Sequence, residues 1–155
     1  MCKGIGMSKV VEVFRVGEVS PGRTLLAAPV AVAAGFPSPA QDYYDGPIDL
    51  TEMLVEDHAA TFIVRAAGHS MTNAGISDGD ELLVDRSRTP QDGDVVIAVL
   101  DGELTIKRLV VDDAAIVLRA ESNEHPDIVV DELSELTIWG VATYCIHHLN
   151  RARSR

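Results

Sequence analysis

The sequence of 155 residues predicts a mainly β fold with short helices at most. Runs rich in β-branched and aromatic residues alternate with clusters of glycine, aspartate and proline, which is typical of strands joined by tight turns. The strongest local signal is the dipeptide Asp101-Gly102 between two apolar runs, because such a two-residue turn predicts a β-hairpin. The sequence shows no repeat and no helix-turn-helix pattern, so we expect one domain preceded by an arm.

Residues 1–45 are interpreted as that N-terminal arm. Residues 10–16 predict a short strand, and the turn-forming residues at 20–22 end it. The segment 35–39 contains two prolines, which donate no backbone hydrogen bond, so we expect no regular element there. The arm is therefore expected to be mobile over much of its length.

The folded domain is predicted to span residues 46–149. It begins with a short helix over 48–56, because Asp49 can cap it and apolar residues follow at helical spacing. A strand over 61–66 leads directly to Ser70. Further strands are predicted over 81–85, 95–100, 103–111, 115–119, 127–130 and 136–146. Residues 150–155 form a basic tail that we expect to be frayed.

Composition limits the classes of function. The formal net charge of -11 repels a phosphate backbone, so we expect no direct sequence-specific DNA binding, and any link to DNA should run through a partner. Two cysteines, Cys2 and Cys145, exclude a disulfide framework and fit a reducing cytoplasm, with Cys145 expected to be buried. No apolar run reaches the ~18 residues that a membrane span requires, so no membrane association is expected.

Two residues point to nucleophilic chemistry. Ser70 lies in the glycine-containing run Ala-Gly-His-Ser-Met, and Lys107 lies in the middle of an apolar predicted strand. A serine hydroxyl is a poor nucleophile until a base accepts its proton, and a lysine can do so only as the neutral amine. Burial among apolar neighbours disfavours the ammonium, and a pKa lowered by ~3 units brings the amine near neutrality. Taken singly, Ser70 is more typical of a turn residue, and Lys107 is more typical of a lysine that reaches water from an edge strand.

Other polar residues are interpreted more simply. His69 precedes Ser70, but successive residues point in different directions, so it is poorly placed to accept the serine proton. The acidic residues between 78 and 94 stand beside glycines and are assigned to turns. We predict no metal and no cofactor, because the other histidines lack the spacing of metal ligands. These histidines are His58, His125, His147 and His148.

The serine and lysine motifs, with the Asp-Gly hairpin between them, resemble the peptidase domain of the LexA/UmuD family of self-cleaving serine peptidases. The resemblance covers residues 29 to 146. It rests on the segments Phe36-Pro37-Ser38-Pro39-Ala40, Gly68-His69-Ser70-Met71, Gly75-Ile76-Ser77-Asp78-Gly79-Asp80, Val84-Asp85, Gly93-Asp94, Asp101-Gly102-Glu103 and Thr105-Ile106-Lys107.

This resemblance implies a compact LexA/UmuD-type peptidase β fold and assigns roles to individual residues. Ser70 matches the nucleophile and Lys107 the general base, and the backbone amides of Ser70 and Met71 are expected to stabilise the oxyanion. The bond between Ala34 and Gly35 matches the self-cleavage site, since the family cuts after alanine or cysteine and before glycine. Small residues also allow close approach of the main chain to a serine, although such a segment taken alone is more typical of a linker.

Within the family, the chain is similar to the UmuD branch, because the 34 residues before Gly35 are too few for a DNA-reading domain. That branch implies a homodimer and cleavage activated by a RecA filament on single-stranded DNA. It also implies a role in the SOS response as accessory subunit of a UmuC-like Y-family polymerase in error-prone translesion synthesis. Two features depart from the pattern: His69 replaces a frequent aspartate, and the arm is longer.

Two other functions remain open from the sequence. The chain could be a non-cleaving LexA-like regulator or dimerisation module without a DNA-binding domain. It could also be a signal-peptidase-like enzyme that acts on other proteins, although the sequence offers no membrane segment for such a role.

Overall fold

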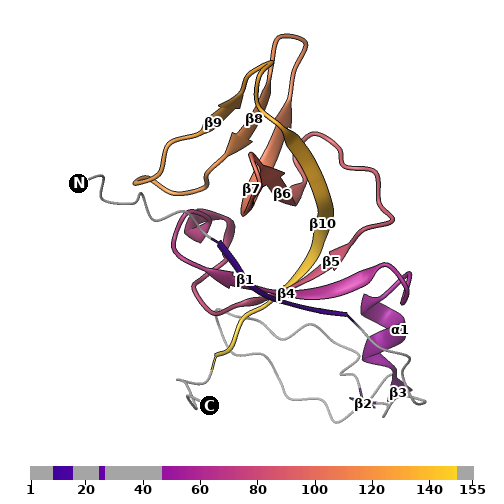
Figure 1. Cartoon of the computed structure of the whole chain (residues 1–155). Coiled ribbons are helices and arrows are strands. Elements are labelled where there is room, and N and C mark those ends of the chain that lie inside the picture. Colours follow the sequence, from indigo (N-terminus) through magenta and orange to yellow (C-terminus); the bar gives the residue numbers. More distant parts are fainter. Residues whose placement is uncertain (1–8, 16–24, 27–46, 150–155) are drawn as a thin grey trace. The chain divides into compact units, whose positions relative to one another are not determined.

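A computed structural model describes residues 9–15, 25–26 and 47–149 of the chain (Figure 1). The contacts between residues divide the chain into two units. Residues 9–15 and 57–149 belong to the first unit, and residues 25–26 and 47–56 belong to the second. Residues 34–35, the turn at 20–22 and the tail at 150–155 lie outside the described residues.

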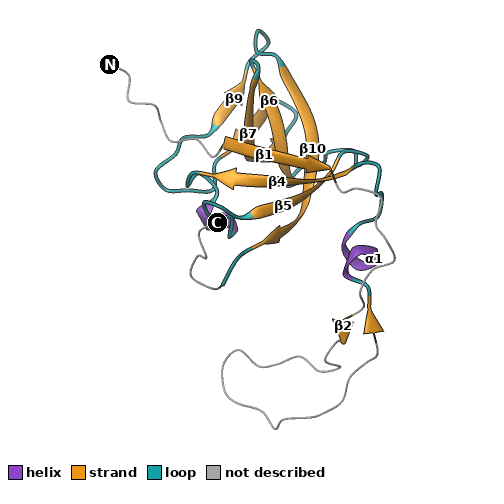
Figure 2. Ribbon diagram, turned by 60° about the horizontal axis from the view of Figure 1, so that its bottom comes forward, coloured by secondary structure: helices purple, strands orange, loops and turns teal. Residues whose placement is uncertain are grey.

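The first unit is built on one eight-stranded sheet in which every neighbouring pair is antiparallel (Figure 2). The strand order is β1-β4-β5-β10-β6-β7-β8-β9. This confirms the predicted mainly β fold. The strands are β1 (Lys9–Arg15), β4 (Thr61–Ala67), β5 (Glu81–Asp85), β6 (Val95–Leu100), β7 (Glu103–Val111), β8 (Ile116–Arg119), β9 (Ile128–Val130) and β10 (Leu136–Ile146).

Strand β10 joins the two halves of this sheet. Its residues 136–141 pair with β6, and its residues 141–146 pair with β5. The pairing with β6 has a register shift between Ile138 and Gly140, and the pairing with β5 has one between Ala142 and Tyr144. A Cβ atom at Gly140 would lie 2.6 Å from Val84 Cγ1, so the close approach of β5 requires glycine here. Figure 1 shows β10 as a long curved strand that spans both groups of strands.

The hydrophobic core consists of two clusters, to which alternate residues of β6 contribute. The first is formed by Val64, Ala66, Met71, Ile76, Leu82, Val84, Ile97 and Ile106. The second is formed by Val96, Ala98, Leu109, Leu118 and Val141. The first cluster contains Met71, which directly follows Ser70, and Ile106, which directly precedes Lys107. Packing of apolar side chains therefore brings two segments 37 residues apart to the same place.

The strand predicted over 10–16 is present as β1, one residue earlier. It pairs with β4, with Lys9 opposite Ala67 and Arg15 opposite Phe62, and so forms one edge of the sheet. The sequence predicted the strand but not its pairing, because β4 lies about fifty residues further along the chain and no local pattern links the two.

The second unit contains a short β-pair and the predicted helix. β2 (Leu25–Leu26) pairs with β3 (Pro47–Ile48), and α1 (Leu50–Leu54) follows. The Asp49 side chain accepts hydrogen bonds from the amides of Thr51 and Glu52, so the predicted cap is confirmed. No helix within the described part of the chain is long and apolar enough to cross a membrane.

Replacement of Gly140 by alanine tests the contact between β10 and β5. The added methyl group collides with Val84, so we expect the free energy of unfolding to fall by about 1–3 kcal/mol. The measurement is urea denaturation followed by circular dichroism. Thr137→Ala, an exposed position on the same strand, is the control and should stay within about 0.5 kcal/mol of wild type. Equal stability of the two variants would show that the backbone relaxes around residue 140.

Candidate active site

Ser70 lies on a turn that the sequence builds locally. Strand β4 ends at Ala67, and Gly68 adopts a φ of 93°, a backbone conformation that favours glycine. The Gly68 amide donates to Asp78 Oδ1 at 2.8 Å, which closes the loop after the serine. A short 3-10 helix, η1 (Thr72–Ala74), follows and was not predicted. Ser70 is therefore held between the end of β4 and the buried side chain of Met71.

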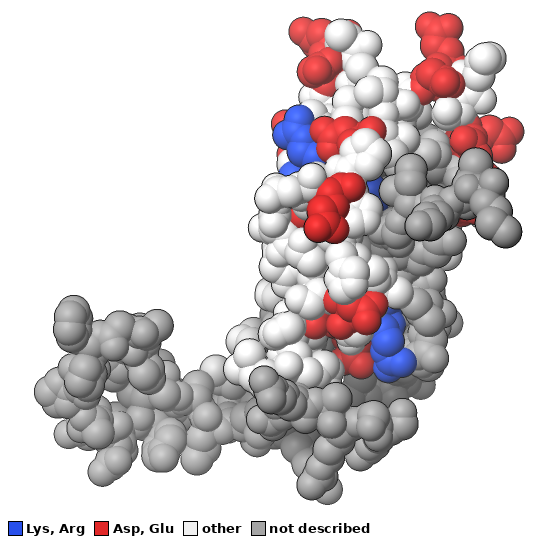
Figure 3. Space-filling model, turned by 90° about the vertical axis from the view of Figure 1, so that its left-hand side faces the viewer, with Lys and Arg blue, Asp and Glu red and all other residues white. Residues whose placement is uncertain are grey.

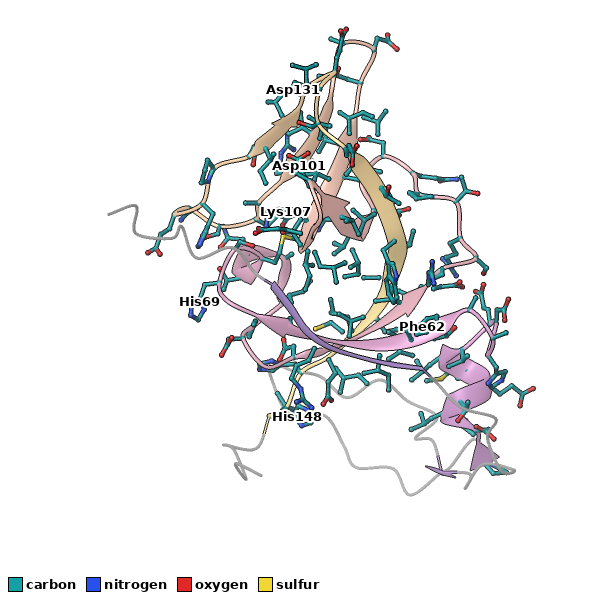
Figure 4. The ribbon with its side chains drawn as sticks, viewed as in Figure 1. Phe62, His69, Asp101, Lys107, Asp131 and His148 are labelled. Carbon is teal, nitrogen blue, oxygen red and sulfur yellow. The ribbon has the colours of Figure 1, made fainter. Side chains whose placement is uncertain are left out.

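Lys107 lies in the middle of β7, the second strand of the predicted hairpin. Asp101 and Gly102 form the turn with φ values of 49° and 83°, which confirms the two-residue loop. Lys107 stands opposite Val96 on β6 and is 1 % exposed, which makes it the largest fully buried side chain of those described. Figure 4 shows Lys107 within the body of the first unit.

The two side chains meet in the protein interior. Lys107 Nζ lies 2.9 Å from Ser70 Oγ, and Ser70 has no exposed surface. The same nitrogen donates to the Ile106 carbonyl at 3.0 Å and to Thr105 Oγ1 at 3.1 Å. These contacts hold the amine in one position and point it at the serine. The arrangement is a buried lysine within proton-transfer distance of a buried hydroxyl.

Burial determines the charge state of this lysine. Loss of hydration lowers the pKa of Lys107 from 10.5 to about 8. The lowering is slightly smaller than the ~3 units expected from the sequence. About a tenth of the molecules carry the neutral amine at pH 7, and about nine tenths carry it at pH 9. The amine can therefore accept a proton from Ser70 at mildly alkaline pH.

His69 does not take part in this contact. Its side chain is exposed, and Figure 4 shows the ring pointing away from Lys107. The sequence-based expectation that His69 is poorly placed to serve as the base agrees with this geometry. Within the described part of the chain, no group of three or more histidine, cysteine, aspartate or glutamate side chains is arranged to hold a metal ion.

The C-terminal histidines make contacts that the sequence did not reveal. His147 Nδ1 lies 2.7 Å from Oδ1 of the buried Asp80, and His148 Nε2 lies 3.0 Å from Glu81 Oε2. Cys145 was expected to be buried, and this is wrong: it is exposed, with Sγ 3.5 Å from Asp80 Oδ2. Among the described strands, this end of β10 pairs with β5 and not with β6.

Sequence reasoning found the serine and the lysine but missed the groups that hold them. Thr105 could have been found, because residues two apart on a strand share a face. The backbone amides of Ser70 and Met71 stay predicted oxyanion donors, and Ala34 and Gly35 lie outside the described residues.

Comparison with known proteins agrees with this geometry. The model of the family described as Peptidase S24-like matches residues 26–143. Protein ImpA of Salmonella typhimurium is 42% identical over 120 residues, which cover 77% of this chain and 81% of ImpA. Protein MucA of Escherichia coli is 39% identical over 116 residues, covering 74% of this chain and 79% of MucA. The LexA repressor of Oleidesulfovibrio alaskensis is 41% identical over 118 residues, covering 75% of this chain and 56% of the repressor.

The chain belongs to the Peptidase S24-like family. Its relatives include both a LexA repressor and the shorter ImpA and MucA proteins, so the resemblance to the LexA/UmuD family stated from the motifs is confirmed.

Lys107→Met tests the cost of the buried amine. Because the pKa in the folded protein lies below that in the unfolded chain, the unfolded chain binds more protons between about pH 8 and 10.5. Stability of the wild type should therefore rise with pH over this range relative to Lys107→Met. The measurement is the difference in unfolding free energy between the two proteins at pH 7.5 and pH 10. The exposed variant Arg119→Met is the control, and parallel stability curves for wild type and Lys107→Met would contradict the prediction.

Proposed function

We propose that the protein is a serine endopeptidase that cuts its own Ala34-Gly35 bond. The observation that carries this proposal is the 2.9 Å contact between Lys107 Nζ and Ser70 Oγ in the interior. A lysine with a pKa of about 8 supplies a neutral amine close to physiological pH, which is what a serine needs for activation.

The proposed reaction proceeds in two steps. Lys107 accepts the Ser70 proton while Oγ attacks the Ala34 carbonyl carbon, and the resulting ammonium returns the proton to the Gly35 nitrogen as the peptide bond breaks. Water then attacks the ester between Ser70 and Ala34 while Lys107 accepts its proton. The resulting ammonium returns that proton to Ser70 Oγ as the C–O bond breaks and the Ala34 carboxyl group is released. The backbone amides of Ser70 and Met71 are the proposed donors to the oxyanion.

The Thr105 hydroxyl and the Ile106 carbonyl support this mechanism by binding Lys107 Nζ. Both accept hydrogen bonds from Nζ, so the amine keeps partners after the serine proton has moved. In this proposal the chain has three regions. An arm over residues 1–45 carries the cleaved bond, residues 46–149 form a peptidase and dimerisation domain, and residues 150–155 form a basic tail.

The cellular role that we infer is that of the UmuD branch of the family. The shortened chain would act in the cytoplasm as a homodimeric accessory subunit of a UmuC-like Y-family polymerase, after cleavage activated by a RecA filament on single-stranded DNA. The exposed apolar side chains of Tyr144 and Ile146 on β10 suit a dimer contact. Acidic side chains outnumber basic ones on the face in Figure 3 and in the sequence, so we expect contact with DNA through a partner.

Incubation of the purified protein tests the cleavage. We expect a single cut that separates residues 1–34 from 35–155, detected by intact mass. Its first-order rate should rise about tenfold between pH 7 and pH 9, because the neutral fraction of Lys107 rises by that factor. Ser70→Ala and Lys107→Ala should not cut, whereas Ser87→Ala, a serine bound to Asp85 away from the dyad, should cut at the wild-type rate.

Dilution and oligomeric state separate this proposal from its alternatives. A rate that is independent of protein concentration is expected for cutting within one chain or one stable dimer. A rate proportional to concentration would indicate an enzyme that acts on other molecules. No product at pH 7, 9 or 10, even with a RecA filament on single-stranded DNA present, would reject the peptidase and favour a regulator that works by binding.

A further inference from the structure

We propose that Arg108 and Glu121 are positioning residues that fasten the serine-bearing turn to the strand of Lys107. The inference rests on the proposed function, because the property that it explains is the rate of self-cleavage. The loop between β8 and β9, residues 120–127, forms the link. Neither residue belongs to the dyad.

Arg108 ties this loop to β7. It directly follows Lys107, so its side chain points to the other face of the strand. Its Nε donates to Glu121 Oε1, and its Nη1 donates to the Gly93 carbonyl at 2.7 Å. Gly93 is itself held to β7, since its amide donates to the Leu109 carbonyl at 2.9 Å. Glu121 therefore pairs with a guanidinium that is fixed by two acceptors.

Glu121 also reaches the serine turn. Its backbone carbonyl accepts a hydrogen bond from the Asn73 amide at 2.8 Å, and Asn73 lies in η1, three residues after Ser70. A second contact reinforces the first, because Asn73 Nδ2 donates to Asn123 Oδ1 at 3.3 Å. Figure 1 shows the β8–β9 loop beside the turn that follows β4. Hydrogen bonds thus connect β7 to the serine turn through three residues: Arg108, Glu121 and Asn73.

Hydrogen bonds within the 120–127 loop fix its conformation, so the loop can restrain the serine turn. The Ala120 amide donates to Asp127 Oδ1 at 3.1 Å, which closes the loop at its base. Ser122 Oγ lies 3.0 Å from His125 Nδ1 across the loop. The Arg108 and Glu121 side chains are 31% and 22% exposed, so their ion pair is better shielded from water than a surface pair.

Placement matters because proton transfer and attack depend on short distances. Ser70 and Lys107 come from segments on different parts of the sheet, and an error of about 1 Å in a reacting group can cost up to about a hundredfold in rate. The bonds through Arg108 and Glu121 restrain the serine turn in addition to the core contact of Met71. They act on geometry and leave the burial of Lys107 unchanged.

The test compares self-cleavage of wild type, Glu121→Gln, Arg108→Gln and the double variant from pH 6.5 to pH 10. We expect each single variant to lower the plateau rate at high pH about tenfold, with the pH midpoint unchanged. The double variant should be no slower than either single variant, because the two side chains act as one unit. Arg119→Gln, which removes the exposed pair with Asp127 on the same loop, is the matched control and should keep the wild-type rate.

Hydrogen exchange gives a readout that does not depend on cleavage. In the uncut Ser70→Ala protein, Glu121→Gln should speed exchange of the Asn73 amide about tenfold, and Arg119→Gln should not. Unchanged exchange at Asn73, or a wild-type plateau rate in Glu121→Gln, would overturn the positioning role. The positioning role would also be overturned if the two substitutions lowered the plateau cleavage rate additively, or if either substitution displaced the pH midpoint. A wild-type protein that does not cut would instead reject the proposed function.

Discussion

The structure depends on placing one lysine amine where water does not reach it. Desolvation of Lys107 opposes its charge, and the resulting neutral amine lies 2.9 Å from the Ser70 hydroxyl. The charged form carries a desolvation penalty at this place, so burial raises the fraction of the neutral form that the proposed reaction requires. Hydrogen bonds to Thr105 and Ile106 reduce the cost of burying the nitrogen and give it one direction.

This constraint explains why the sheet is organised around β10. The serine follows β4 and the lysine lies on β7, and these strands belong to different halves of the sheet. β10 pairs with both halves, and the core cluster that contains Met71 and Ile106 packs at their junction. Such a cluster resists deformation, because protein interiors are close-packed and have low compressibility. A rigid junction is a suitable place to hold two reacting groups at hydrogen-bond distance.

The family model and the geometry of the site agree. The model matches residues 26–143, which include both Ser70 and Lys107, and the structure brings these two residues into contact. The positioning role of Arg108 and Glu121 extends this picture outward, from the reacting atoms to the loop that joins β8 and β9. It assigns a function to a loop that the peptidase chemistry alone leaves unexplained.

The motifs that resemble the LexA/UmuD family identified the two candidate reactive residues. Local chemistry in the sequence determined the strands of the main sheet, the Asp101-Gly102 hairpin and the Asp49 cap. Each of these follows from residues within one turn or one strand, where propensity and alternation act directly. Only the tertiary structure decided that β1 pairs with β4, that His147 meets Asp80 and that Glu121 joins Arg108 to Asn73. These contacts join positions far apart in the chain, and no local pattern encodes them, because they arise from how the whole sheet buries its apolar faces. The lowered pKa of Lys107 has the same origin, since desolvation is a property of the folded interior and not of the strand that carries the lysine.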